Sequence, residues 1–256
     1  MTGGVRVRGG VRVSAGGAGQ PVLLLLHGLG ATGDVWNGWH GLLAARWPGR
    51  WLAPDLPGHG GSAPLDRYSF ESLAAGVAGV LDPEDRVVVL GHSLGGVVGL
   101  ALAGGGFGGS VEAVVGLGVK VAWTPDELAR VGSLAYRPVA RFTSRAEAVA
   151  RYLRVSGLAN LLGDDDSRVD AGVRAEQGHW RLAMDPGAFA VGAPDMPSLL
   201  AAVPASVVLA RGEHDPMVTG ADLARLGVPA ITLAGLGHNA HVDAPDQLAA
   251  LIRALY

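Results

Sequence analysis

The sequence has no cysteine. This absence excludes disulfide frameworks, thiolate metal sites and cysteine nucleophiles, and it agrees with the reducing cytoplasm in which we expect the protein. Lysine is almost absent as well, since Lys120 is the single lysine and the other cations are arginines. The net charge is only −3, with no basic stripe. We therefore expect neither nucleic acid nor an anionic membrane as a partner.

Long hydrophobic runs are also missing. The first 20 residues are rich in glycine and carry Arg6, Arg8 and Arg12 between valines, so they lack the apolar centre of a secretory signal peptide. The longest apolar run near them, residues 22–26, is far too short to span a bilayer. We expect a soluble protein, a monomer or a homodimer, that acts on a small molecule.

Apolar residues, by contrast, make up 49% of the chain, and charged residues only 17%. The richness in Ala, Gly, Val and Arg is typical of a GC-rich bacterial genome. A chain of 256 residues with this much apolar material fits one α/β domain that carries an insertion.

Strand-like and helix-like segments alternate along two parts of the chain, which predicts a mostly parallel sheet with helices on both sides. The expected strands are 5–7, 11–13, 21–27, 51–53, 87–90, 111–115, 206–210 and 230–233. The expected helices are 35–46, 69–81, 94–103, 221–226 and 246–255.

The alternation stops between about residues 121 and 200. This segment has helical stretches at 126–131 and 145–156, an acidic loop at 164–166 and several aromatic residues. We interpret residues 121–200 as a helical insertion that serves as a lid. It separates a first part of the core, residues 1–120, from a second part, residues 201–256.

Ser93 is the candidate nucleophile. It stands in the segment Gly-His-Ser-Leu-Gly at 91–95, and with 41 glycines in the chain about 0.3 such matches are expected by chance, so the motif alone is weak. Its context is stronger, because a strand precedes it and a helix follows it. Glycines at both flanks permit a strained, tight turn that exposes the hydroxyl at the N-terminus of the helix.

A serine hydroxyl needs a general base to become a nucleophile. We choose His238, which follows the last predicted strand on a glycine-rich loop. His241 remains its rival, although we expect His241 to pack against the closing helix.

The base needs an acid to orient it. Asp215 follows the strand at 206–210, so it lies, like the base, at the carboxyl end of a strand, where open α/β sheets bind their ligands. Glu213 and Asp243 remain as alternatives.

Other polar residues are expected to have structural roles. His27 and His59 stand next to glycines and are expected to shape loops, and His92 to pack beside the nucleophile. Asp55 is expected to brace its turn through bonds from its side chain to the backbone.

Five segments in this order resemble the α/β-hydrolase superfamily, and the resemblance covers essentially the whole chain. They are residues 27–30, 55–62, 91–96, 212–215 and 237–241. The resemblance implies an α/β-hydrolase fold, with a helical cap inserted after the sixth strand. It also implies an oxyanion hole formed by the backbone N–H groups of Leu29 and Leu94.

The implied reaction is acyl transfer through an acyl-enzyme on Ser93, without a metal or an organic cofactor. We expect a carboxylesterase-like or lactonase-like enzyme that cleaves an ester, a lactone or a thioester of a small to medium apolar substrate. A C–C bond hydrolase, an enol-lactone hydrolase or a lyase with the same triad is the alternative, and a non-catalytic small-molecule receptor is a more distant one. The candidate substrate contacts are Trp123, Tyr136, Phe142, Trp180 and Met217, although the aromatic residues suit the core of the cap equally well.

Overall fold

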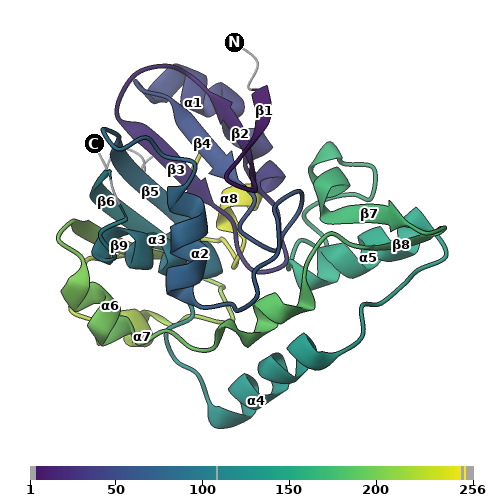
Figure 1. Cartoon of the computed structure of the whole chain (residues 1–256). Coiled ribbons are helices and arrows are strands. Elements are labelled where there is room, and N and C mark those ends of the chain that lie inside the picture. The colour runs from purple at the N-terminus through teal and green to yellow at the C-terminus, as the bar shows by residue number, and fades with distance from the viewer. Residues whose placement is uncertain (1–3, 108, 249–250, 252–256) are drawn as a thin grey trace.

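The computed structural model describes residues 4–107, 109–248 and 251, and an eight-stranded sheet forms its centre (Figure 1). The strands, in chain order, are β1 (Gly4–Arg8), β2 (Val11–Gly16), β3 (Val22–Leu26), β4 (Trp51–Pro54), β5 (Arg86–His92), β6 (Ser110–Leu117), β9 (Ser206–Gly212) and β10 (Ala230–Leu233). Their order in the sheet is β1-β2-β4-β3-β5-β6-β9-β10. Neighbours from β4 to β10 run parallel, and β1 and β2 form an antiparallel edge. The predicted, mostly parallel sheet is therefore confirmed.

Helices cover both faces of this sheet. They are the 3-10 helix η1 (Gly33–Trp39) and the α-helices α1 (His40–Arg46), α2 (Phe70–Ala78), α3 (Leu94–Gly104), α6 (Met196–Ala202), α7 (Gly220–Ala224) and α8 (Ala240–Asp243). The helix predicted at 35–46 thus begins as a 3-10 helix, in a stretch where Asn37 and Gly38 have low helix propensity. The helix predicted at 246–255 falls largely outside the described residues.

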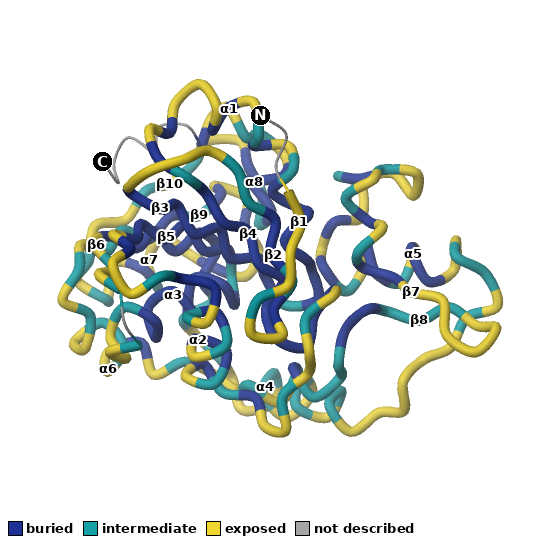
Figure 2. Tube along the Cα trace, turned by 45° about the horizontal axis from the view of Figure 1, so that its top comes forward, coloured by how far each residue is buried: buried dark blue, intermediate teal, exposed yellow. Residues whose placement is uncertain are grey.

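Side chains along the central strands alternate between two apolar layers. In β3, Leu23 and Leu25 join the layer that contains Trp36, whereas the other three residues join the layer formed with α2 and α3. All five residues of β3 are buried. A strand buried on both faces needs the continuous apolar run that predicted it. Figure 2 shows these strands as a buried layer inside more exposed outer elements.

The segment between β6 and β9 is not purely helical. Before α6 it contains α4 (Pro125–Ser133), η2 (Leu134–Tyr136), α5 (Arg145–Val155), η3 (Ser167–Gly172), β7 (Val173–Glu176), β8 (His179–Leu182) and η4 (Pro186–Val191). The strands β7 and β8 form an antiparallel hairpin, which the helical interpretation missed. These strands have only four residues each, and their turn at Gln177 and Gly178 is not one of the strong hairpin signals.

The end of this segment belongs to the sheet layers. Helix α6 packs against α3, where a side chain at Gly104 would lie 3.1 Å from the Cβ atom of Ala202. We therefore propose that the insertion ends before Met196 rather than at residue 200. In contrast, α4 has no buried residue and packs mainly against η2 and η4, and Figure 1 shows it apart from the sheet. Among the described residues, no helix combines the length and the apolar character needed to cross a bilayer.

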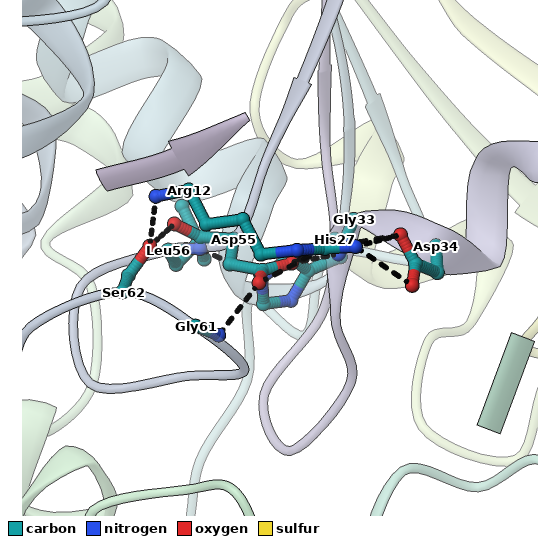
Figure 3. Close-up of polar contacts among 8 residues, drawn as sticks. All are labelled: Arg12, His27, Gly33, Asp34, Asp55, Leu56, Gly61 and Ser62. Atoms are coloured by element: carbon teal, nitrogen blue, oxygen red, sulfur yellow. Dashed lines mark hydrogen bonds and ion pairs between the residues drawn. The ribbon is translucent and has the colours of Figure 1, made fainter. Parts of the chain in front are cut away.

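A buried ionic network joins the loops that follow β3 and β4 (Figure 3). Arg12 of β2 lies 3.0 Å from the carboxylate of Asp34 and 3.2 Å from that of Asp55. The carboxylate of Asp55, which is fully buried, also accepts the N–H groups of Gly33 at 2.7 Å and Gly61 at 2.9 Å. The expected bracing role of Asp55 agrees with these bonds, which hold the two loops together at the edge of the sheet.

Candidate active site

Ser93 occupies a strained turn between β5 and α3. Its φ of 50° and ψ of −115° lie in a region that L-residues rarely adopt. The flanking glycines leave no room for side chains, because a Cβ atom at Gly95 would lie 2.5 Å from the carbonyl oxygen of Leu26, and one at Gly91 would meet the backbone of Gly95. The N–H of Ser93 donates to the carbonyl of Leu117 at 2.8 Å, which fixes the turn against β6.

His238 and Asp215 form a hydrogen-bonded pair. Nδ1 of His238 lies 2.9 Å from Oδ2 of Asp215, whose side chain is fully buried. The other carboxylate oxygen of Asp215 accepts the N–H of Met217 at 2.8 Å. An Nδ1–H that donates to a carboxylate leaves Nε2 of the imidazole free to accept a proton. Gly118 provides the space, since a Cβ atom there would lie 3.1 Å from Nδ1 of His238.

The rival residues lie elsewhere. His241 is buried, with its ring centroid 4.6 Å from that of Trp36 and 4.3 Å from that of His92, so it packs between these rings. Burial lowers the pKa of His241 to about 3. Glu213 and Asp243 are exposed, and among the described carboxylates only that of Asp215 pairs with His238.

Ser93 and His238 both line a cavity of about 600 Å³. The structure thus brings the three predicted residues together, with Asp215 behind His238. Among the described groups, no hydrogen bond joins the Ser93 hydroxyl to His238. Such bonds often shorten only when substrate is bound, so the arrangement is compatible with a nucleophile and its base.

Leu29 and Leu94, whose backbone N–H groups are the predicted oxyanion hole, also line this cavity. Leu94 is the first residue of α3, where N–H groups have no partner within the helix. Within the described part of the chain, neither N–H has a hydrogen-bond acceptor. Residues 27–30, here called the Leu29 loop, lie close to the nucleophile, since a Cβ atom at Gly28 would lie 3.4 Å from Cβ of Ser93.

His27 orients one of these N–H groups. Its Nε2 accepts the N–H of Leu56 at 2.8 Å, so its proton is on Nδ1, which donates to the carbonyl of Gly28 at 2.8 Å (Figure 3 shows His27 and Leu56). That carbonyl and the N–H of Leu29 belong to one planar peptide unit, so the bond sets the direction of the N–H. Burial lowers the pKa of His27 to about 4, and the ring therefore stays neutral near pH 7.

His92 holds the loop that carries the candidate base. Its Nε2 lies 3.1 Å from the carbonyl oxygen of His238, and the two ring centroids are 4.7 Å apart. Burial lowers the pKa of His92 well below its usual value, so the neutral ring donates from Nε2 to that carbonyl. The expected packing role therefore includes a hydrogen bond to the His238 loop (residues 235–239). No signal near Gly-His-Ser-Leu-Gly in the sequence indicates which distant loop crosses this ring.

The predicted substrate contacts divide into two groups. Trp123, Tyr136 and Met217 line the cavity. Phe142 and Trp180 do not, because they exchange two backbone hydrogen bonds, of 2.8 and 2.9 Å, and pack against the apolar core. The structure therefore places these two predicted contacts beside each other, with Trp180 on the unpredicted strand β8, and not in the lining of this cavity.

Several lining residues were not singled out by the sequence. They are contributed mainly by α4, by the end of α5 and by η4, and they include Lys120, Leu128, Val131, Arg154 and Ala190. Apolar spacing along α4 could have identified Leu128 and Val131 as one face, but not what that face meets. Within the described residues, no group of three or more His, Asp or Glu side chains is arranged to hold a metal ion.

Comparisons with known proteins agree with this architecture. The model of the alpha/beta hydrolase family matches residues 23–251. The magnesium-chelatase 30 kDa subunit of Rhodobacter capsulatus is 30% identical over 94% of this chain and 88% of that protein. The 2-succinyl-6-hydroxy-2,4-cyclohexadiene-1-carboxylate synthase of Serratia proteamaculans is 28% identical over 93% of this chain and 94% of that protein.

Two further comparisons cover very different shares of the matched proteins. The chain spans about a quarter of the length of uncharacterized mycobacterial relatives, which are 44% identical over 86 residues. The crystal structure of an esterase from Mycobacterium tuberculosis has a TM-score of 0.75 and 26% identity, and the match covers 98% of this chain and 89% of that one.

Proposed function

The chain belongs to the alpha/beta hydrolase family, and from this premise we propose that it cleaves carboxylic esters, lactones or thioesters through an acyl-enzyme on Ser93. One observation carries the proposal: Ser93 and the pair His238–Asp215 meet at one cavity. The solved esterase with a similar fold supports a hydrolase of this kind.

The first half of the proposed reaction acylates the enzyme. The oxygen of Ser93 attacks the substrate carbonyl carbon while Nε2 of His238 takes the hydroxyl proton. Asp215 holds the Nδ1 proton and stabilises the imidazolium that forms. The tetrahedral intermediate then collapses, the bond to the leaving group breaks, and His238 gives its proton to the departing oxygen or sulfur.

The second half releases the acid. His238 takes a proton from a water molecule, whose oxygen attacks the acyl carbonyl, and the bond to Ser93 breaks as His238 returns the proton to the serine oxygen. In both halves the negative oxygen is held by the N–H groups of Leu29 and Leu94. Donors of this kind contribute about 3 kcal/mol each to the transition state.

Two neutral histidines keep these parts in place. His27 directs the N–H of Leu29 through the carbonyl of Gly28. His92 holds the backbone of His238. A displacement of a catalytic group by about 1 Å can cost about 100-fold in rate, so both bonds support the proposed chemistry.

The cavity supports the proposed substrate size. Its volume of about 600 Å³ lies in the range of small-molecule sites, and most of its lining is apolar. Such a wall accepts a small to medium acyl group and keeps water away from the reacting carbonyl.

A second candidate function uses the same groups. The Serratia relative is named a synthase, and its likeness extends over nearly both chains, which favours a lyase or a C–C bond hydrolase as the alternative. A non-catalytic receptor is less well supported, because it would not need the bond between His238 and Asp215.

The deciding experiment measures hydrolysis of p-nitrophenyl esters of increasing chain length by the wild type and by Ser93→Ala. We expect the substitution to lower kcat by at least about 10³-fold. A fluorophosphonate should label the wild type on the peptide that contains Ser93. Unchanged turnover in Ser93→Ala would contradict the nucleophile, and turnover of only an activated C–C substrate would favour the second candidate.

A further inference from the structure

The wall of the cavity carries positive charge and no carboxylate. Of its described lining residues, two are fully charged, Lys120 and Arg154, and none is Asp or Glu. Most of the other lining residues are apolar, as Val131 and Phe189 illustrate. Charges act more strongly in such surroundings than in open water, so the sign of the wall bears on which substrates enter.

The charge of Lys120 is balanced inside the protein. Its Nζ lies 2.9 Å from Oε1 of Glu127 and 5.0 Å from the ring centroid of Trp123. The N–H of Thr124 and the ammonium group lower the pKa of Glu127 to about 2, so this carboxylate stays charged. Lys120 lines the cavity, but its charge is thus already paired with Glu127 at the N-terminus of α4.

Arg154 has no such partner. Its Nε donates to the carbonyl of Ala150 in the same helix at 3.1 Å, and among the described residues no Asp or Glu forms an ion pair with it. The side chain is exposed and lines the cavity. A guanidinium group with unused N–H donors matches a carboxylate in a two-bond geometry.

The residues that follow Arg154 at the end of α5 contact both the Leu29 loop and the His238 loop. On one side, Cγ1 of Val155 lies 2.7 Å from the place that a Cβ atom at Gly30 of the Leu29 loop would take. On the other side, the carbonyl of Gly157 accepts a hydrogen bond of 3.0 Å from Asn239 of the His238 loop. A sphere with the volume of this cavity, about 600 Å³, is about 10 Å across, and this is the length scale on which a charge on the wall and the reacting bond are separated.

We propose that Arg154 forms a carboxylate-binding subsite, and that the substrates are esters, thioesters or lactones whose acyl group carries a carboxylate within about 10 Å of the reacting carbonyl. This inference rests on the proposed hydrolase function and names its substrate class. The apolar wall contacts the hydrocarbon part of the acyl group, between its carboxylate and its reacting carbonyl, while Arg154 binds the carboxylate.

The test compares two esters that differ at the far end of the acyl chain. One is mono-p-nitrophenyl glutarate, and the other is p-nitrophenyl 5-methylhexanoate, in which an isopropyl group replaces the carboxylate. Arg154→Gln removes the cation. Arg151→Gln is the matched control, because Arg151 lies on the same helix but does not line the cavity.

We expect Arg154→Gln to lower kcat/KM for the glutarate ester about 10–100-fold more than for the uncharged ester, mainly through KM, because the ion pair forms before and during the reaction. Arg151→Gln should keep the ratio between the two esters within about twofold of that of the wild type. Equal losses on both esters in Arg154→Gln, or the same change of ratio in Arg151→Gln, would overturn the subsite.

A binding measurement separates this inference from the proposed function. In Ser93→Ala, calorimetric titration with glutarate should give a Kd about tenfold lower than in Ser93→Ala/Arg154→Gln. If Ser93→Ala still hydrolyses both esters, the proposed function fails, whereas binding that depends on Arg154 keeps the subsite. If turnover requires Ser93 but neither binding nor the ester ratio depends on Arg154, only the subsite fails.

Discussion

Mild acid should remove much of the stability of this fold, because several histidines are buried in neutral form. Burial lowers the pKa of His27 to about 4, and those of His59 and His241 to about 3. Each of these three side chains is at most 1% exposed. In the unfolded chain the same groups take up a proton near pH 6.5.

The sign of the effect follows from proton binding. Below about pH 6.5 the unfolded chain binds protons that the folded chain does not, so stability is complete above this pH and is lost as the pH falls toward the folded pKa values. Between about pH 8 and pH 5 this amounts to about 2 kcal/mol per histidine, or on the order of 6 kcal/mol for the three. Domains of this kind have only about 5–15 kcal/mol in total.

Urea unfolding, followed by tryptophan fluorescence at the two pH values, measures this loss. His241→Phe keeps a ring between Trp36 and His92 and removes one titrating group, so it should reduce the pH dependence by about 2 kcal/mol. His179→Gln is the control, because His179 is exposed on β8. Equal unfolding midpoints at both pH values, or equal effects of the two substitutions, would refute the argument.

Three further predictions concern activity. Asp215→Asn should lower kcat by about 10³–10⁴-fold in a p-nitrophenyl ester assay, whereas Glu213→Gln should change kcat less than about threefold. The reverse result would assign the role of the acid to Glu213. His92→Phe should lower kcat about 10–100-fold with little change in KM. His92→Gln should restore part of the lost kcat, because an amide N–H can donate to the same carbonyl. Equal losses of kcat in the two variants would reduce the role of His92 to packing. Gly118→Ala places a methyl group 3.1 Å from Nδ1 of His238 at a φ of 63° and should lower kcat about 100-fold. Gly41→Ala is the control and should leave kcat unchanged, because no atom lies within 4 Å of the new methyl group. A fully active Gly118→Ala would show that the imidazole can shift without cost.

The sheet was predictable from the sequence because its central strands are buried on both faces. The residues of β3 have to be apolar without interruption, and this pattern is visible in the sequence without any tertiary information. The hairpin β7–β8 has no such constraint. Only Val173 of β7 is buried, and the side chains of β8 are exposed or half-buried, so neither apolar alternation nor length distinguished these strands from loops.

The candidate catalytic residues were predictable for a related reason. Parallel strands end at the same edge of the sheet, so Ser93 after β5 and Asp215 after β9 meet although 122 positions separate them in the sequence. The roles of His27 and His92 were less accessible. Each depends on which backbone carbonyl lies beside the ring, and that contact is set by the packing of distant loops rather than by local pattern.

The lining of the cavity could not be predicted from sequence patterns of this kind, and α4 illustrates the reason. Leu128 and Val131 are three positions apart and form an apolar face, which in most helices predicts burial against a core. Here no residue of α4 is buried, and both side chains line the cavity. An apolar face that the protein itself leaves uncovered gains its missing contacts when an apolar group enters. The same spacing is therefore compatible with one wall of a binding site, and in the proposed function the acyl chain of the substrate supplies the missing contacts.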